Sequence, residues 1–556
     1  MDLVCIVVHL YNGDKMSVDM RGRNGVKIRL PKKEIGEFVN SLKKSTGSNP
    51  ITEIPKITDP AIEILEFKPI RPPYSYARIL YNNRSKDFLY EAIEPHLNDE
   101  EQEFYNFIEE SLKKTLTYDV DHLKYQDKEE YLKGNVESFL QSRATKITPI
   151  LREKLIYYVL RDYIGYGPID VLIRDEEVED ISCDGVGINV YIFHQKYESI
   201  RSNVIINSDE KINSFVISLS QRSGKQASVA NPIVDGTTTE GHRLQATYAR
   251  EISTRGGSFT IRRFKERPFT PVDIIISKTA SVDMMVYMWV AAENGESLII
   301  CGGPGAGKTS TLNAVALFIP PTSKIVSMED TREINLPHEN WIPGATRSGT
   351  GERGIDGRAP GEIDMFDLVR AALRQRPNFI IVGEVRGKET YTMFQAMATG
   401  HTTYSTMHAD SVKSMVNRLE NPPINTPRIL LSALNNVIIQ HQVRVGMNVV
   451  RRIKQIVEIV GFEPETNELI TNTVFEWDSN NDTFIYRGHS FLYDKVMEMK
   501  NLTHEEMEEE VNRRVEVLNY LVSRKVVDFK KFAQIIISYY KEPHETIEKI
   551  RGGKFA

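Results

Sequence analysis

A short apolar run followed by a glycine-rich turn and a lysine constrains the fold of this 556-residue chain more than any other feature. Residues 298–301 predict a buried strand, and residues 309–318 predict a helix just after the turn. The turn fits the pattern G-x-x-x-x-G-K-[ST]. Its residues are Gly302, Gly303, Pro304, Gly305, Ala306, Gly307, Lys308 and Thr309, followed by Ser310.

The chemistry of this turn predicts a phosphate-binding loop that takes ATP with Mg²⁺. Glycines let consecutive backbone N–H groups form an anion nest, and the following helix directs its positive end toward the same anion. Lys308 is expected to reach the β- and γ-phosphate oxygens, and Thr309 offers a hydroxyl to the metal. A glycine-rich turn with an incidental lysine is the alternative.

Further apolar runs after the loop predict the fold of the C-terminal half. Residues 324–327 and 379–382 are short and continuously apolar, with helical stretches between them, which is typical of a buried parallel sheet in an α/β domain. From about Arg451 the pattern changes to hairpin-like strands. A helix that begins with Thr503 and Glu506 follows them.

The length of the chain favours several domains. We predict an accessory N-terminal region over 1–115, with strands at 4–8 and 26–30, and an α+β domain over 116–265. A linker with Pro268 and Pro271 over 266–275 forms the predicted hinge, and 276–556 forms the ATPase domain. One helix is predicted after the cap residue Asn98, and another follows Thr148 and Pro149, with Pro149 at its first position.

Charge and composition exclude several function classes. The net charge is -6, so no general basic field attracts nucleic acid, and nucleic acid is not the expected main partner. Three cysteines lie far apart, which indicates neither a disulfide framework nor a zinc ribbon. No apolar run reaches the length of a spanning helix, and residues 1–10 lack the features of a signal peptide.

A carboxylate follows the predicted strand at 379–382, where Gly383 and Glu384 come next. If this strand lies beside the phosphate loop, Glu384 can orient or deprotonate the water that attacks the γ-phosphate. The alternative is a structural salt bridge between Glu384 and Arg386.

Two adjacent carboxylates, Glu329 and Asp330, follow the other predicted strand. They could hold Mg²⁺, or Glu329 could act as the base, but in a regular strand only one of them can face the nucleotide. A helix cap is the structural alternative.

Two histidines, His401 and His408, lie seven residues apart among hydroxyl side chains. Metal ligation is disfavoured because no third ligand has a familiar spacing, and a core or capping role is the alternative.

Together, the loop at 302–309, the Glu329–Asp330 pair, Glu384 and the histidine segment at 400–408 resemble the type II/type IV secretion ATPase superfamily. Residues 336–341, and the lack of a four-cysteine zinc module, resemble its archaeal branch, the archaellum assembly and rotation ATPase. The resemblance implies a RecA-like C-terminal domain, a separate N-terminal domain that caps the nucleotide, and a homohexameric ring. It also adds His408 to the catalytic residues.

The resemblance further implies arginines of the N-terminal domain that reach the phosphates. Arg250, Arg262 and Arg263 match that region, and Arg262 and Arg263 are the favoured catalytic pair, with no choice between them. The implied partners are a polytopic membrane platform protein and, in the archaellum case, a second cytoplasmic ATPase-like protein. The implied place is the cytoplasm, at the inner face of the membrane.

The resulting hypothesis is an ATP-driven motor for an archaellum or a type IV pilus-like filament. Residues 349–361 are expected to form a mobile loop of its cycle, with simple disorder as the alternative. A nucleic-acid translocase or helicase on the same RecA-like fold is the second hypothesis, since fold does not fix function. A scaffold that only binds nucleotide is the third, and the presence of both Lys308 and Glu384 argues against it.

Overall fold

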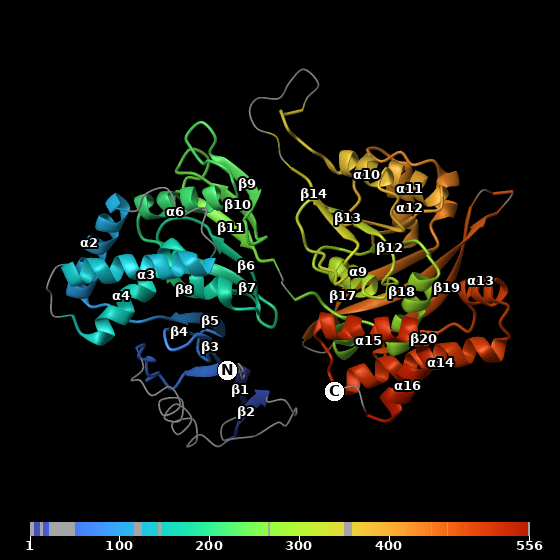
Figure 1. Cartoon of the computed structure of the whole chain (residues 1–556), viewed down its shortest axis with the longest axis horizontal. Coiled ribbons are helices and arrows are strands. Elements are labelled where there is room, and N and C mark those ends of the chain that lie inside the picture. The colour runs from blue at the N-terminus through green and yellow to red at the C-terminus, as the bar shows by residue number, and fades with distance from the viewer. Residues whose placement is uncertain are drawn as a thin grey trace. The chain divides into compact units, whose positions relative to one another are not determined.

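The chain folds as two compact units, residues 1–264 and 265–556, each with its own nine-stranded sheet (Figure 1). The computed structural model describes residues 5–11, 15–21, 51–115, 125–142, 147–264, 267–347, 349, 358–445, 448–463, 465–466 and 468–553. The predicted strand at 26–30 and most of the predicted loop at 349–361 lie outside these ranges.

The sheet of the second unit confirms the predicted α/β architecture. Its strand order is β14-β13-β15-β16-β12-β17-β18-β19-β20; neighbouring strands are parallel as far as β17, and the remaining pairs are antiparallel. The strands are β12 (Leu298–Cys301), β13 (Ile325–Glu329), β14 (Trp341–Ala345), β15 (Phe379–Val382), β16 (Thr402–Met407), β17 (Asn436–Val445), β18 (Asn448–Phe462), β19 (Leu469–Asp478) and β20 (Thr483–Tyr486).

Helices cover both faces of this sheet, with α10–α12 on one face and α14–α16 on the other (Figure 1). Side chains alternate between the two cores, because Leu298 and Ile300 pack on one face and Ile299 and Cys301 on the other. The helices are α7 (Pro271–Ile276), α8 (Val282–Glu293), α9 (Lys308–Ala316), α10 (Met365–Leu373), α11 (Glu389–Ala398), α12 (Val412–Glu420), η3 (Arg428–Ala433), α13 (Phe491–Lys500), α14 (His504–Ser523), α15 (Phe529–Lys541) and α16 (Pro543–Arg551).

The parallel register brings the carboxyl ends of four strands to one edge of the sheet. Met328 of β13 lies opposite Val382 of β15, and Val382 lies opposite Ser405 of β16. Met407 of β16 lies opposite Cys301 of β12. Loops that follow these strands therefore meet at one place, which is where open α/β sheets bind their ligands.

The first unit contains the second nine-stranded sheet, in the order β3-β4-β5-β8-β7-β6-β11-β10-β9. Its strands are β3 (Ile62–Arg71), β4 (Ser75–Asn82), β5 (Asp87–Ile93), β6 (Val178–Cys183), β7 (Asn189–His194), β8 (Glu198–Ile205), β9 (Ile233–Thr237), β10 (Arg243–Thr247) and β11 (Ser258–Arg262). Its helices are α2 (Asp99–Thr115), α3 (Tyr125–Ser142), α4 (Pro149–Tyr163), η2 (Gly167–Ile169), α5 (Asp170–Arg174) and α6 (Asp209–Arg222).

Strands from before residue 115 join strands from after it, because β5 pairs in parallel with β8. A separate hairpin of β1 (Cys5–Tyr11) and β2 (Lys15–Arg21) covers most of the strand predicted at 4–8. Within the predicted hinge, residues 271–275 belong to α7. The division into an accessory region, a capping domain, a hinge and an ATPase domain stays a prediction.

The helix ends follow the predicted capping residues. Thr503 and Glu506 form a capping box at α14, and Thr148 caps α4 with Pro149 at its first position. Asn98 and Glu101 bond each other's backbone N–H groups at the start of α2. Among the helices of the described ranges, none combines the length and the apolar character needed to cross a membrane.

Candidate active site

The phosphate loop connects β12 to α9, as the sequence predicts. Gly305 (φ 68°) and Gly307 (φ 89°) adopt the left-handed backbone conformation that favours glycine, and Gly307 caps α9. Thr309 and Ser310 lie partly buried in the first turn of that helix. A Cβ atom on Gly303 would meet no atom within 4 Å, so this side of the loop is open to a ligand.

The Lys308 side chain is 9% exposed, and its ammonium donates a hydrogen bond to the Gly303 carbonyl at 3.0 Å. Burial lowers the pKa of Lys308 from its ordinary value, and the negative charge of Glu384 opposes that shift. Lys308 is therefore a partly desolvated cation, directed at the loop, for which an anion is the natural partner.

His408 connects Lys308 to Glu384. Its Nδ1 lies 3.3 Å from the Lys308 ammonium, and its Nε2 lies 3.2 Å from a carboxylate oxygen of Glu384. Because the ammonium can only donate, we assign Nδ1 as the acceptor and a protonated Nε2 as the donor to Glu384. The neutral imidazole thus orients the carboxylate while accepting a hydrogen bond from the lysine.

The structural alternatives have different outcomes, since the His401 backbone N–H bonds the Ala396 carbonyl at the end of α11, as a capping residue would. Among the described contacts Glu384 forms no salt bridge with Arg386, whose guanidinium donates to Asp330 instead. His401 precedes the first residue of β16, at the end of the strand opposite to His408, and its Nδ1 lies 3.4 Å from the Thr399 hydroxyl.

Glu329 ends β13 and is 3% exposed. One of its carboxylate oxygens accepts backbone N–H bonds from Glu333 and Ile334, at 2.9 and 3.0 Å. Its other oxygen has no hydrogen-bond partner within the part of the chain that the structure describes. Burial raises the pKa of Glu329 to about 7, and the two backbone N–H bonds act against that rise. No helix begins after Glu329, so the two backbone N–H bonds hold the loop that follows β13 and do not cap a helix.

Asp330 is half-exposed and lies in the loop after β13. It accepts a hydrogen bond from the Thr346 hydroxyl at 3.2 Å, in addition to its ion pair with Arg386. The Thr309 hydroxyl and the carboxylates of Asp330 and Glu329 are hard oxygen donors of the kind that Mg²⁺ prefers. With the open nest and the buried lysine, this donor set fits a magnesium nucleotide.

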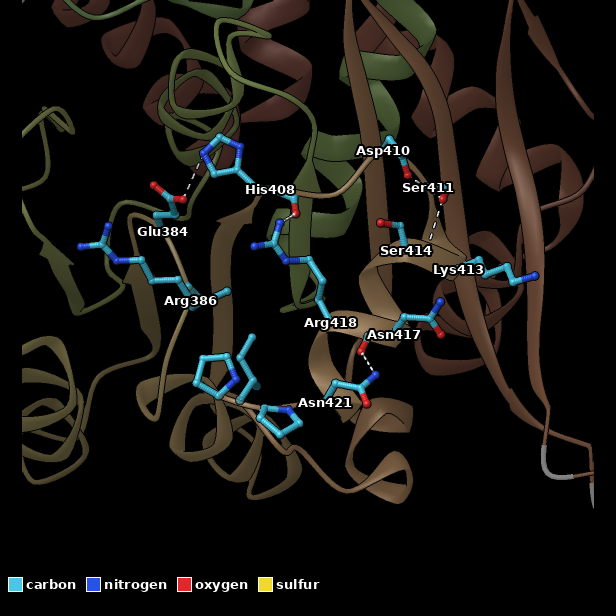
Figure 2. A pocket seen from close by; sticks show the side chains of 14 residues that line it. Glu384, Arg386, His408, Asp410, Ser411, Lys413, Ser414, Asn417, Arg418 and Asn421 are labelled. Atoms are coloured by element: carbon cyan, nitrogen blue, oxygen red, sulfur yellow. Dashed lines mark hydrogen bonds and ion pairs between the residues drawn. The ribbon is translucent and has the colours of Figure 1, made fainter.

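Two hollows have Glu384 in their walls. The first, of about 740 Å³, is lined by His408, Lys413 and Arg418 as well as Glu384. Figure 2 shows Glu384 and His408 facing each other beside it, with Arg418 reaching the His408 carbonyl. The second hollow, of about 650 Å³, contains Asp330 on its wall and shares Glu384 and Arg386 with the first. The Glu384 side chain is 39% exposed, so water can reach its carboxylate.

Three residues of the site were not predicted from the sequence. Gln440 and Arg451 donate hydrogen bonds to the loop carbonyls of Ala306 and Gly305, and Arg418 supports the main chain at His408. A buried glutamine directly after the apolar run 437–439 is the one local signal that could have indicated Gln440.

The predicted arginines belong to the first unit and differ in their surroundings. Arg250 and Arg262 are about 60% exposed and pair with Asp209 and Asp180. Arg263 is more enclosed and donates hydrogen bonds to the backbone carbonyls of Asp175 and Val178.

This arrangement defines the class of P-loop nucleoside triphosphatases with a RecA-like parallel sheet. The family described as "Type II/IV secretion system protein" matches residues 250–520. The uncharacterized protein MJ0900 of Methanocaldococcus jannaschii is 37% identical over 403 residues, which cover 71% of each chain. The type IV secretion system protein PtlH of Bordetella pertussis is 32% identical over 182 residues, 31% of this chain and 52% of PtlH.

The chain also aligns with the solved structure of the ATPase DotB from Legionella pneumophila, with 16% identity, a TM-score of 0.37, and coverage of 74% of this chain and 97% of DotB. From the family match and the relatives, the chain belongs to the type II/type IV secretion ATPase superfamily. This membership confirms the resemblance inferred from its motifs. The assignment to the archaellum branch stays a prediction.

Replacing Gly302 by alanine is expected to weaken ATP binding at least about tenfold, because the new Cβ atom would overlap the backbone carbonyl oxygen of Gln440 on β17. Glu339→Gln is the control, since it changes an exposed side chain outside the loop. Equilibrium binding of a fluorescent ATP analogue measures both variants. Equal affinities would contradict the packing described here.

Glu329→Gln is expected to change how stability depends on pH. The raised pKa means that folded Glu329 keeps its proton where the unfolded chain releases it, so wild-type stability falls as the pH rises from 4.5 to about 7. Relative to Glu329→Gln, the wild type should lose roughly 2 to 3 kcal/mol over this window.

Urea unfolding followed by tryptophan fluorescence measures this effect in the second unit, because Trp289, Trp341 and Trp477 all lie there. The exposed Glu339→Gln is the control and should follow the wild type. An identical pH slope for Glu329→Gln and the wild type would show that Glu329 is ionised in the folded state.

Proposed function

We propose that this ATPase works as a homohexameric motor that drives assembly or rotation of an archaellum or type IV pilus-like filament from the cytoplasmic face of the membrane. The connection from Lys308 through His408 to Glu384 carries the hydrolytic part of this proposal. The type IV secretion name of PtlH supports the secretion part.

In the proposed hydrolysis step Glu384 accepts a proton from water as the water oxygen attacks the γ-phosphorus. The bond between the γ-phosphorus and the bridging oxygen breaks, giving ADP and phosphate. Lys308 stabilises the charge on the phosphate oxygens, and His408 holds the Glu384 carboxylate in place. Thr309 and Asp330 would hold Mg²⁺, which when bound supplies further positive charge to the β- and γ-phosphates.

An arginine from the first unit completes the proposed site. Between the two candidates left open by the sequence, we favour Arg262, because its side chain is about 60% exposed and pairs with the partly exposed Asp180. Arg263 would have to give up two backbone carbonyls in order to reach a phosphate. Arg250 is as exposed as Arg262 and is proposed to contact the nucleotide.

A polytopic membrane platform protein is the proposed partner on which the motor acts, with a second cytoplasmic ATPase-like protein in the archaellum case. Movement of the two units against each other during ATP binding and release would transmit the work.

The active-site proposal predicts different defects for Lys308→Ala and Glu384→Gln. Lys308→Ala should lose ATP binding, because the partly buried cation of the loop is gone. Glu384→Gln should bind ATP but turn over roughly 10² to 10⁴ times more slowly, since glutamine cannot accept the proton. Phosphate release and analogue binding measure both, with Glu339→Gln as the control. Normal turnover by Glu384→Gln would make Glu329 the next candidate base.

The same variants test the motor function. Glu384→Gln with ATP, used as bait on native membranes, should retain a polytopic membrane protein that Lys308→Ala does not. ATPase activity stimulated by single-stranded DNA or RNA with a steep salt dependence, together with no membrane partner, would support the translocase hypothesis instead.

The arginine assignment predicts that Arg262→Ala and Arg263→Ala fail for different reasons. Arg262→Ala should keep the melting temperature and ATP affinity of the wild type but lose roughly 10³-fold in turnover. Arg263→Ala should lower the melting temperature, because the backbone carbonyls of Asp175 and Val178 lose a buried donor. Calorimetry and phosphate release separate the two. Normal turnover by Arg262→Ala would remove it from the mechanism.

A further inference from the structure

The hairpin formed by β17 and β18 contacts the outer surface of the phosphate loop. Gln440 of β17 donates through Nε2 to the Ala306 carbonyl at 2.8 Å. Arg451 of β18 donates through Nε to the Gly305 carbonyl at 3.1 Å. Two consecutive carbonyls of the loop are thus held by side chains that lie more than 130 residues away in the sequence.

Strand pairing places these side chains at the loop. Ile439 lies opposite Cys301, the last residue of β12, so Gln440 follows level with the start of the loop. Gln442 projects to the same side as Gln440 and lies opposite Arg451 in the hairpin. Its Oε1 atom would lie 3.4 Å from a Cβ atom on Gly305. A shift in the pairing between Ile439 and Gln440 adjusts the hairpin just where the loop begins.

The two arginines at this point of β18 have different surroundings. Arg452 is buried and forms an ion pair with Asp482, as expected of a structural arginine. Arg451 is partly exposed, and within the described ranges its guanidinium forms only the hydrogen bond to the Gly305 carbonyl. Its contact is therefore with the loop and not with a carboxylate.

We propose that Arg451, together with Gln440, is a positioning residue that fixes the phosphate loop in its nucleotide-binding conformation. The two bonds hold the Gly305 and Ala306 carbonyls toward the hairpin. The N–H groups of the loop then remain directed toward the bound anion. A glycine-rich loop can otherwise adopt many backbone conformations. The two bonds therefore reduce the conformational entropy that the loop loses when a nucleotide binds. The inference rests on the proposed binding of ATP by this loop.

The test compares Arg451→Met, Arg451→Gln, Arg451→Lys and Lys454→Ala in the full-length protein. Methionine keeps the length of the side chain but has no donor, whereas glutamine keeps an N–H donor without the charge. Lys454→Ala is the control, because it removes an exposed cation from the same strand without touching the loop. Gln440 is 1% exposed, so its replacement risks the fold, and Arg451 carries the test.

We expect Arg451→Met to bind fluorescent analogues of ATP and ADP roughly tenfold more weakly, as the loss of one charge-assisted hydrogen bond implies. Its KM should rise by a similar factor while kcat changes less than about threefold. Hydrogen–deuterium exchange of the peptide containing 302–309 should increase in the nucleotide-free variant, with the sheet peptides unchanged. Arg451→Gln should recover part of the affinity, and Lys454→Ala should match the wild type.

Wild-type affinity and exchange in Arg451→Met would overturn this inference while leaving ATP binding intact. Recovery by Arg451→Lys but not by Arg451→Gln would also overturn it, because the charge would then act on the phosphates directly. If neither the wild type nor Lys454→Ala binds nucleotide, the proposed function fails as well, so the two failures are distinguishable.

Discussion

The parallel pairing of β12 with β16, and of β13 with β15, is the constraint on which the rest of the site depends. Strands that run in the same direction end at the same edge, so residues 302–309, Glu329, Glu384 and His408 meet although the chain separates them by up to a hundred residues. Each of these strands is buried on both faces, and its apolar side chains pack into the two cores that flank the sheet. The two hydrophobic cores therefore fix where the strands end, and polar contacts then orient the loop and the side chains at that edge.

His408 lies between the two opposite charges of the site, Lys308 and Glu384. A direct ion pair between Lys308 and Glu384 would have to break before the lysine could bind a phosphate and the carboxylate could bind water. With a neutral imidazole between them, both groups keep an oriented hydrogen bond, and their charges still attract each other. Asp330 and Glu329 have partners of their own, because Asp330 pairs with Arg386 and Glu329 accepts two backbone N–H bonds.

The sequence best predicted the features that depend on residues close together in the chain. The turn that joins β12 to α9, the parallel strands, and the helix caps at Thr503 and Thr148 depend on residues a few positions apart, and the structure confirms these elements. Pairings across long stretches of chain were not predictable, such as Gln440 and Arg451 on the loop or β5 beside β8. The different positions of His401 and His408 could have been predicted, because a strand of six residues puts residues seven apart about 20 Å from each other.

The division of the groups between the two units has a mechanical consequence. The phosphate loop, the carboxylates and His408 lie in the second unit, while Arg250 and Arg262 lie in the first. Each unit has its own sheet and core, so it can move as a body without loss of its buried apolar surface. If an arginine of the first unit must reach the γ-phosphate before turnover, hydrolysis requires a rigid-body closure, and release of phosphate removes the charge that holds the closed state. ATP hydrolysis and the movement of the units then cannot occur separately, and a motor requires this coupling.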